Sequence, residues 1–120
     1  MEQWEPISFN ELSDEIQKSE LDLSEELSNF WQLIKIDPIK WSEKDYGDEG
    51  GGFWVVALCG DKIIWYNDIE EGFNISNYNK LGEIKDYCCN QDELSWAVAK
   101  LFNFIKFGES LIQRTGPQKS

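Results

Sequence analysis

The chain has 120 residues and carries 23 Asp and Glu against 11 Lys and Arg, which gives a formal net charge of −12 without any histidine. A hydrophobic fraction of 41% with 14% aromatic residues is too high for a disordered acidic chain, and the length suits one domain with its own core. The absence of histidine removes the commonest general base and metal ligand, so triads that need histidine are excluded.

The N-terminus reads MEQWEPISFNEL and carries acids where a secretory signal needs basic and apolar segments. Three cysteines, two of them adjacent at Cys88 and Cys89, form neither a disulfide framework nor a zinc-binding spacing. We therefore expect a cytoplasmic protein with reduced thiols, no cofactor and no metal. We expect a single domain over residues 1–120, with an ordered core over about 5–108 and a loose tail over 109–120.

The charge is unevenly distributed along the chain. Every acidic residue except Glu109 lies within residues 1–93. A field of this sign repels nucleic-acid phosphates and anionic membranes, and it speeds the encounter with basic proteins. The charge therefore predicts a basic protein partner and no nucleic-acid or membrane partner, with solubility alone as the alternative explanation.

Two helices are predicted at the start of the chain. Ser8 and Glu11 have the spacing of a capping box, which predicts a helix over residues 9–18. The sequence DLSE at residues 22–25 caps a second helix that is amphipathic, because its apolar residues recur at helical spacing. Pro38 ends that pattern, so residues 39–42 are predicted to form at most a short edge strand.

The strongest strand signal lies over residues 53–68, where FWVVALC and KIIWYND flank Gly60-Asp61. A two-residue turn with glycine first predicts a β-hairpin. Both faces of this hairpin are apolar, so we expect a covering layer on each. The predicted pairs on the face beneath the C-terminal helix are Leu58 with Ile63, Val56 with Trp65 and Trp54 with Asn67, and those on the other face are Ala57 with Ile64, Val55 with Tyr66 and Phe53 with Asp68.

Three segments around the hairpin complete the prediction for the sheet. Residues 43–52 (EKDYGDEGGG) combine acids with glycines and predict an exposed, mobile loop. Residues 70–80 are rich in Gly, Asn and Ser and predict an irregular excursion. Residues 82–88 alternate in character and predict a strand beside the hairpin, at an edge that Lys85 protects.

Residues 90–93 (NQDE) predict the start of a helix over 91–107, which Gly108 ends. This helix is apolar around most of its circumference, so we expect burial on more than one side, either within the chain or partly against another subunit. The predicted fold is α+β, in the order α-α-(β)-β-β-β-α. It has N-terminal helices, a small antiparallel sheet built on the central hairpin, and a long C-terminal helix packed on that sheet.

The segments GGGFWVVA, YNDIEEGFN and NQDEL, within roughly residues 38–105, resemble motifs of a small family of uncharacterised bacterial proteins. That resemblance implies no established activity. The plan of acidic N-terminal helices, small sheet and closing helix is similar to immunity proteins of bacterial toxin systems, including the SUKH-type group. This architectural likeness implies an inhibitor that binds a basic toxin or another basic protein.

A partner-binding surface is expected at the open end of the hairpin, where the Gly-rich loop enters one strand and the other strand leaves. Its predicted residues are Tyr46, Asp48, Glu49, Asp68, Glu70, Glu71 and Phe73. The rival hypothesis is an enzyme or divalent-metal site that uses Asp68, Glu70 and Glu71, although these acids lack the spacing of an EF-hand loop. A third hypothesis is a structural or homo-oligomeric role through the C-terminal helix.

Overall fold

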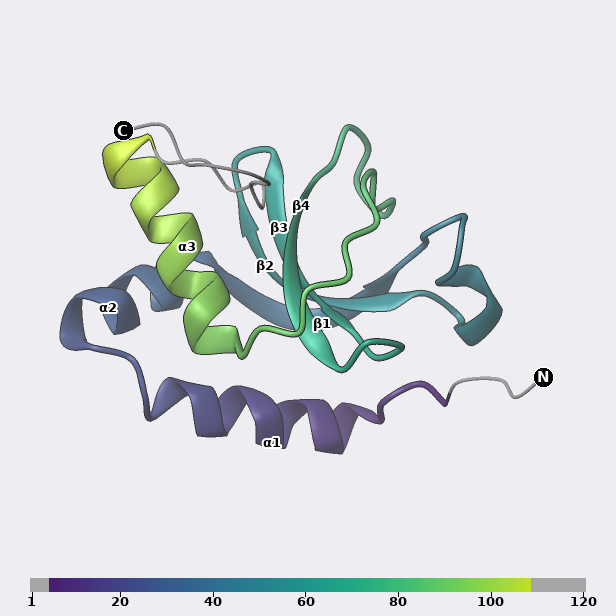
Figure 1. Ribbon diagram of the computed structural model, residues 1–120, viewed down its shortest axis with the longest axis horizontal. Coiled ribbons are helices and arrows are strands. Elements are labelled where there is room, and N and C mark those ends of the chain that lie inside the picture. Colours follow the sequence, from purple (N-terminus) through teal and green to yellow (C-terminus); the bar gives the residue numbers. More distant parts are fainter. Residues whose placement is uncertain (1–4, 109–120) are drawn as a thin grey trace, which may run out of the picture.

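The computed structural model describes residues 5–108, apart from the side chain of Glu49, and these residues form an α+β fold (Figure 1). Its helices are α1 (Phe9–Glu20), α2 (Glu25–Ile34) and α3 (Leu94–Phe107), with a short 3-10 helix η1 (Asp48–Gly50). Its strands are β1 (Lys35–Trp41), β2 (Phe53–Cys59), β3 (Lys62–Asn67) and β4 (Gly72–Asn77), which form one antiparallel sheet in the order β1-β2-β3-β4. The tail predicted to be loose, 109–120, lies outside the described residues.

The two N-terminal helices begin where their capping residues predict. The Ser8 hydroxyl accepts the Glu11 N–H, and the Glu11 carboxylate accepts the Ser8 N–H, so the capping box of α1 is confirmed. The Ser24 hydroxyl accepts the Leu27 N–H and caps α2. Within residues 5–108, no helix has the length and apolar character that crossing a membrane requires.

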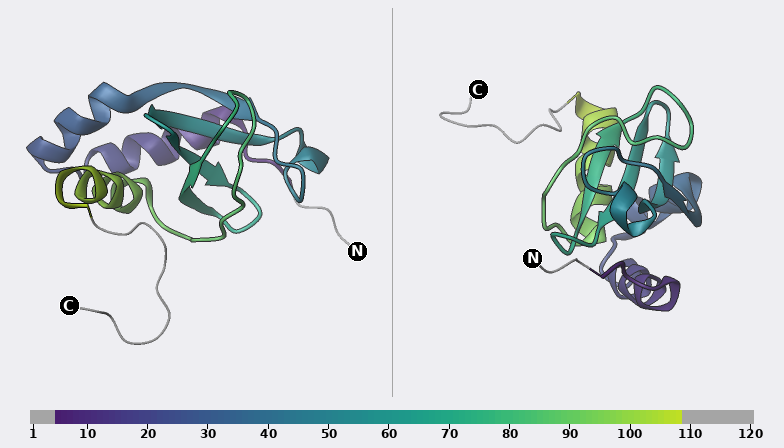
Figure 2. Two further views of the ribbon diagram at one scale, coloured as in Figure 1. Left: turned by 90° about the horizontal axis from the view of Figure 1, so that it is seen from above. Right: turned by 90° about the vertical axis from the view of Figure 1, so that its right-hand side faces the viewer.

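The sheet is covered on both faces, as the apolar hairpin predicts. The helices lie to the left of and below the sheet in Figure 1, and the loops lie mainly at its right. Two further views show the same arrangement (Figure 2). The core on the helix face includes Leu12, Trp31, Ile34, Val56, Ile64, Tyr66, Phe73, Leu94, Val98 and Leu101. The core on the loop face includes Trp41, Phe53, Val55, Ile63, Trp65 and Ile84.

A bulge changes the hairpin register within β2. The two predicted pairs next to the turn, Leu58 with Ile63 and Ala57 with Ile64, are confirmed. Their predicted faces are wrong, because Ile63 belongs to the loop-face core and Ile64 to the helix-face core. Beyond them the observed pairs are Val55 with Trp65 and Trp54 with Tyr66, in place of the predicted Val55 with Tyr66, Val56 with Trp65 and Trp54 with Asn67. Val56 is the extra residue, and it lies in the helix-face core while Trp65 lies in the loop-face core. The prediction that Val56 and Trp65 share a face is therefore wrong.

The flanking strands also differ from prediction. β1 covers Lys35–Trp41 and thus runs through Pro38, and β4 lies inside the segment predicted to be irregular. Residues 82–88 form no strand; they only contribute an isolated bridge between Ser42 and Glu83. The sequence did not predict β4 because both of its faces are buried. Its polar residues, Asn74 and Ser76, lie under the following segment instead of facing water.

The C-terminal helix α3 starts at Leu94 with Glu93 as N-cap, three residues later than predicted, and Gly108 ends it with a φ of 72°. It packs against α1, α2 and β4, which confirms the predicted contact with the sheet. Contact with helices and with the sheet confirms burial on more than one side, although Trp96 and Phe107 remain 65% and 63% exposed. A homo-oligomer through these exposed residues stays a prediction.

Candidate functional site

The loop between β1 and β2 is organised around one buried carboxylate. Glu43 is only 2% exposed, and its carboxylate accepts the N–H groups of Tyr46 and Gly47. The Asp48 carboxylate in turn accepts the Glu43 N–H. A Cβ atom at Gly47 would lie 2.6 Å from the Phe53 ring, so this position has no room for a side chain. The prediction of an exposed loop is therefore wrong for Glu43 and Gly47, although Tyr46 and Asp48 are exposed.

Tyr46 and Glu70 belong to the loop face of the sheet. The rings of Tyr46 and Tyr87 lie 4.4 Å apart, and Tyr87 also packs against the loop-face core. Burial raises the pKa of Tyr87, and the Glu70 carboxylate adds to that rise because a second negative charge nearby is unfavourable. The charge of Glu70 is therefore felt on the loop face, at Tyr87.

Asp68 lies on the other side of the sheet, against the chain that leads into α1. Its Oδ2 atom accepts the Ile7 N–H at 2.7 Å. Its Oδ1 atom is buried and has no hydrogen-bond partner within residues 5–108. Burial raises the pKa of Asp68, although the bond from the Ile7 N–H, a weaker contact with the N–H of Asp68 itself and the charge of Lys40 oppose the rise. The structure thus holds a partly buried carboxylate with one unused acceptor.

Tyr66 is 8% exposed, and the charges of four carboxylates act on its phenol group. Burial and then repulsion from these carboxylates raise the pKa of Tyr66 to about 12. Two of the four come from α1 and two from the β3–β4 turn. We name them the acidic cluster; its members are Glu11, Glu15, Asp68 and Glu71. Phe9, which is half exposed, packs edge-on against Trp54 at the start of the same helix.

Holding these acids together has visible structural costs. Glu11 and Glu15 are like charges one helical turn apart, a spacing that destabilises a helix. Glu71 adopts a φ of 62°, a conformation that is unfavourable for a residue other than glycine. Asp68 is a carboxylate whose burial is incompletely compensated.

The structure divides the seven predicted site residues between three places. Asp68 and Glu71 join the acidic cluster, and Tyr46, Asp48 and Glu70 lie with the loops. Phe73 is only 2% exposed and packs against Tyr66 in the core, so its prediction as a contact residue is wrong. The side chain of Glu49 lies outside the described residues. Prediction of one surface failed because residues 68–71 turn from one face of the sheet to the other.

Glu11 and Glu15 were not among the predicted site residues. Their spacing of four places them on one face of α1, which is a signal that the sequence does contain. What the sequence could not supply was the neighbour, because the approach of α1 to the β3–β4 turn depends on long-range contacts such as that between Ile7 and Asp68.

The loop side suits a basic partner poorly. Asp48 lines a hollow of about 380 Å³ together with three lysines, Lys44, Lys80 and Lys85. These cations offset the local acids. Nor does the part of the chain that the structure describes contain three or more Asp, Glu or Cys side chains grouped to hold a metal ion.

Comparison with known proteins identifies no relative: no protein-family model, curated protein or solved structure matches the chain. The functional argument therefore depends on the acidic cluster and its surroundings.

Proposed function

We propose that the protein is a binding module that captures a basic protein through the acidic cluster, as an immunity-type inhibitor of a basic toxin would in the cytoplasm. The observation that carries this proposal is that four carboxylates from two distant segments act on Tyr66 and help to raise its pKa to about 12. A lysine or arginine of the partner would relieve their mutual repulsion and donate a charge-assisted hydrogen bond.

The unused Oδ1 acceptor of Asp68 supports the same proposal. A buried acceptor without a donor is unfavourable in the free protein, and a partner's guanidinium or ammonium group supplies that donor. Proteins keep unfavourable groups of this kind at sites where binding needs a group that is already in position. The net charge of −12 adds long-range attraction for a basic partner.

The Asp68→Asn variant should be more stable than the unaltered protein near neutral pH. The folded pKa of Asp68 lies above its ordinary 3.8, so its burial lowers stability as pH rises through the interval between these two values. Asparagine removes the charge and keeps an acceptor for the Ile7 N–H. Because the carboxylate is only partly buried, the gain should be less than about 1 kcal/mol.

Urea denaturation near neutral pH and below pH 3.8 checks this prediction, with the exposed Asp45→Asn change as the control. The advantage of Asp68→Asn should shrink at the lower pH, where the native carboxyl is protonated. Lower stability of Asp68→Asn than of Asp45→Asn near neutral pH would contradict the assignment.

Affinity capture from the native host, followed by binding measurements on the recovered protein, tests the function itself. The cluster variant combines Glu11→Gln, Glu15→Gln and Glu71→Gln, and glutamine at position 11 keeps the capping box. The control variant combines Asp45→Asn, Asp48→Asn and Glu83→Gln and changes the net charge equally. The cluster variant should bind about tenfold more weakly than the control variant, since each exposed ion pair contributes about 0.2–1 kcal/mol.

Failure to recover a basic protein, or equal loss of affinity in the two variants, would contradict the proposal. The control also tests Asp48, one of the predicted residues that the sheet places away from the cluster. A larger loss of affinity in the control variant would indicate that the partner binds on the loop side of the sheet.

A further inference from the structure

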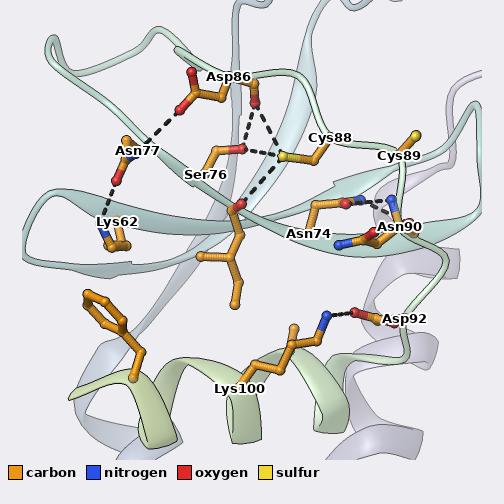
Figure 3. Close-up of a pocket in the computed structure, with 13 residues that line it drawn as sticks. Lys62, Asn74, Ser76, Asn77, Asp86, Cys88, Cys89, Asn90, Asp92 and Lys100 are labelled. Carbon is orange, nitrogen blue, oxygen red and sulfur yellow. Dashed lines mark hydrogen bonds and ion pairs between the residues drawn. The ribbon is translucent and has the colours of Figure 1, made fainter. Parts of the chain in front are cut away.

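A groove of about 570 Å³ lies between the outer edge of β4, helix α3 and residues 86–92 (Figure 3). The chain after β4 makes backbone-to-backbone bonds with that edge at two points, while side chains of Asn74, Ser76 and Cys88 bridge the two segments between them. The Lys85 N–H donates to the Asn77 carbonyl, and the Phe73 N–H donates to the Asp92 carbonyl. Between these contacts six residues of the returning chain face three of β4, so the longer segment bulges outward and leaves the groove.

The bulge leaves hydrogen-bond donors on the β4 edge. Residues along a strand alternate in the direction of their backbone groups, so Phe73, Ile75 and Asn77 all point away from β3. Phe73 donates to Asp92, but the N–H groups of Ile75 and Asn77 have no acceptor within residues 5–108. The groove therefore has two free backbone donors along one wall.

A largely buried cation lies at one end of the groove. The Lys62 side chain is only 16% exposed, and its ammonium group lies 5.1 Å from the centre of the Phe104 ring. It donates to the neutral amide of Asn77 and forms a salt bridge with Asp61 at 3.4 Å, a carboxylate that is 75% exposed. Because water screens an exposed ion pair, an anion held inside the groove would be a stronger partner for this ammonium group.

The other walls of the groove limit the size and charge of a ligand. Ile75, Ala97 and Phe104 supply apolar surface, and Lys100 at the other end is already paired with Asp92. On the rim, the Asn77 amide donates to the Asp86 carboxylate at 3.4 Å, so a negative charge stands near the Lys62 end. This charge disfavours ligands with several negative charges.

We propose that the groove binds a small organic monocarboxylate with an apolar body. The carboxylate accepts hydrogen bonds from Lys62 and from the free N–H groups of β4, and the apolar body packs against Ala97 and Phe104. The volume is within the range of small-molecule sites. Binding is non-covalent, because burial raises the pKa of the Cys88 thiol in the same wall and keeps it protonated. The site is separate from the acidic cluster and independent of the function proposed there.

The test is a titration of 15N-labelled protein with 4-phenylbutyrate, followed by amide chemical shifts. The Ile75 and Asn77 amides should shift and saturate with a dissociation constant of about 1 mM, the affinity expected of so small a ligand. The matched neutral probe, 4-phenylbutan-1-ol, should bind about tenfold more weakly, because it lacks the charge that Lys62 recognises.

Two lysine variants locate the anionic contact. Lys62→Met should weaken binding of 4-phenylbutyrate about tenfold, whereas Lys85→Met, outside the groove, should leave it unchanged. Shifts that do not saturate, equal binding of acid and alcohol, or equal effects of the two substitutions would overturn the proposal. The comparison of the two probes uses the unaltered protein, so it decides the matter even if Lys62→Met fails to fold.

Discussion

Replacement of Leu101 by alanine is expected to lower the free energy of unfolding by about 2 to 5 kcal/mol. Leu101 is fully buried in the helix-face core, where residues from all three helices meet the sheet. Truncation removes apolar surface from that core and leaves a cavity, because close-packed surroundings relax only in part.

Denaturant titration of Leu101→Ala and of Ile105→Ala, on the same helix, measures this effect. Ile105 is 51% exposed, so its truncation should have a much smaller effect while changing helix propensity similarly. A loss below about 0.5 kcal/mol for Leu101→Ala, or a loss no larger than that for Ile105→Ala, would show that α3 does not close the core as described.

The Gly72→Ala substitution is expected to destabilise the protein by about 3 kcal/mol or more. A Cβ atom at Gly72 would lie 2.2 Å from the Gln91 Cα and 2.6 Å from the Asn90 carbonyl oxygen. These are backbone atoms, and the Asn74 side chain holds Asn90 in place by bonding both its N–H and its carbonyl. Relief of the clash would therefore break the contact that brings the chain back to β4.

Gly82→Ala is the matched control for this effect. Gly82 has a φ of +93°, but nothing lies within 4 Å of the position that a Cβ would take. Only backbone strain opposes alanine there, at a cost of about 1 to 2 kcal/mol. Thermal unfolding of the two variants compares them directly. Equal or smaller destabilisation by Gly72→Ala would mean that β4 and residues 90–92 are not in close contact.

Local signals in the sequence predicted much of this fold. The capping residues Ser8 and Ser24 predicted the starts of α1 and α2, Gly108 predicted the end of α3, and Gly60-Asp61 predicted the turn of the hairpin. Each signal depends on side chains within a few residues, so the chain nearby is enough to interpret it.

The errors arose where distant segments decide the structure. The run FWVVALC is apolar at every position, so no polar alternation fixes its register, and the bulge at Val56 could not be foreseen. Asn74 and Ser76 read as loop residues, yet they are buried because Asn90 and the Asp86 carbonyl bond to them from the returning chain.

Only two of the four residues of the acidic cluster were predicted, again because distant segments build the site. Asp68 and Glu71 were found from the position of the hairpin end. Their partners Glu11 and Glu15 lie more than fifty residues earlier, and only the packing of α1 brings them together. The acidic composition gives the sign of the charge, and the basic partner that it suggests stays a prediction; composition carries no information on where the charge accumulates.

Association kinetics of the recovered basic partner give the most direct test of the central claim. We expect the cluster variant (Glu11→Gln, Glu15→Gln, Glu71→Gln) to associate more slowly than the equal-charge control variant, and high salt to abolish most of this difference, since salt screens charges beyond about 8 to 10 Å. An association rate that is insensitive to salt, or identical in the two variants, would contradict binding through the acidic cluster.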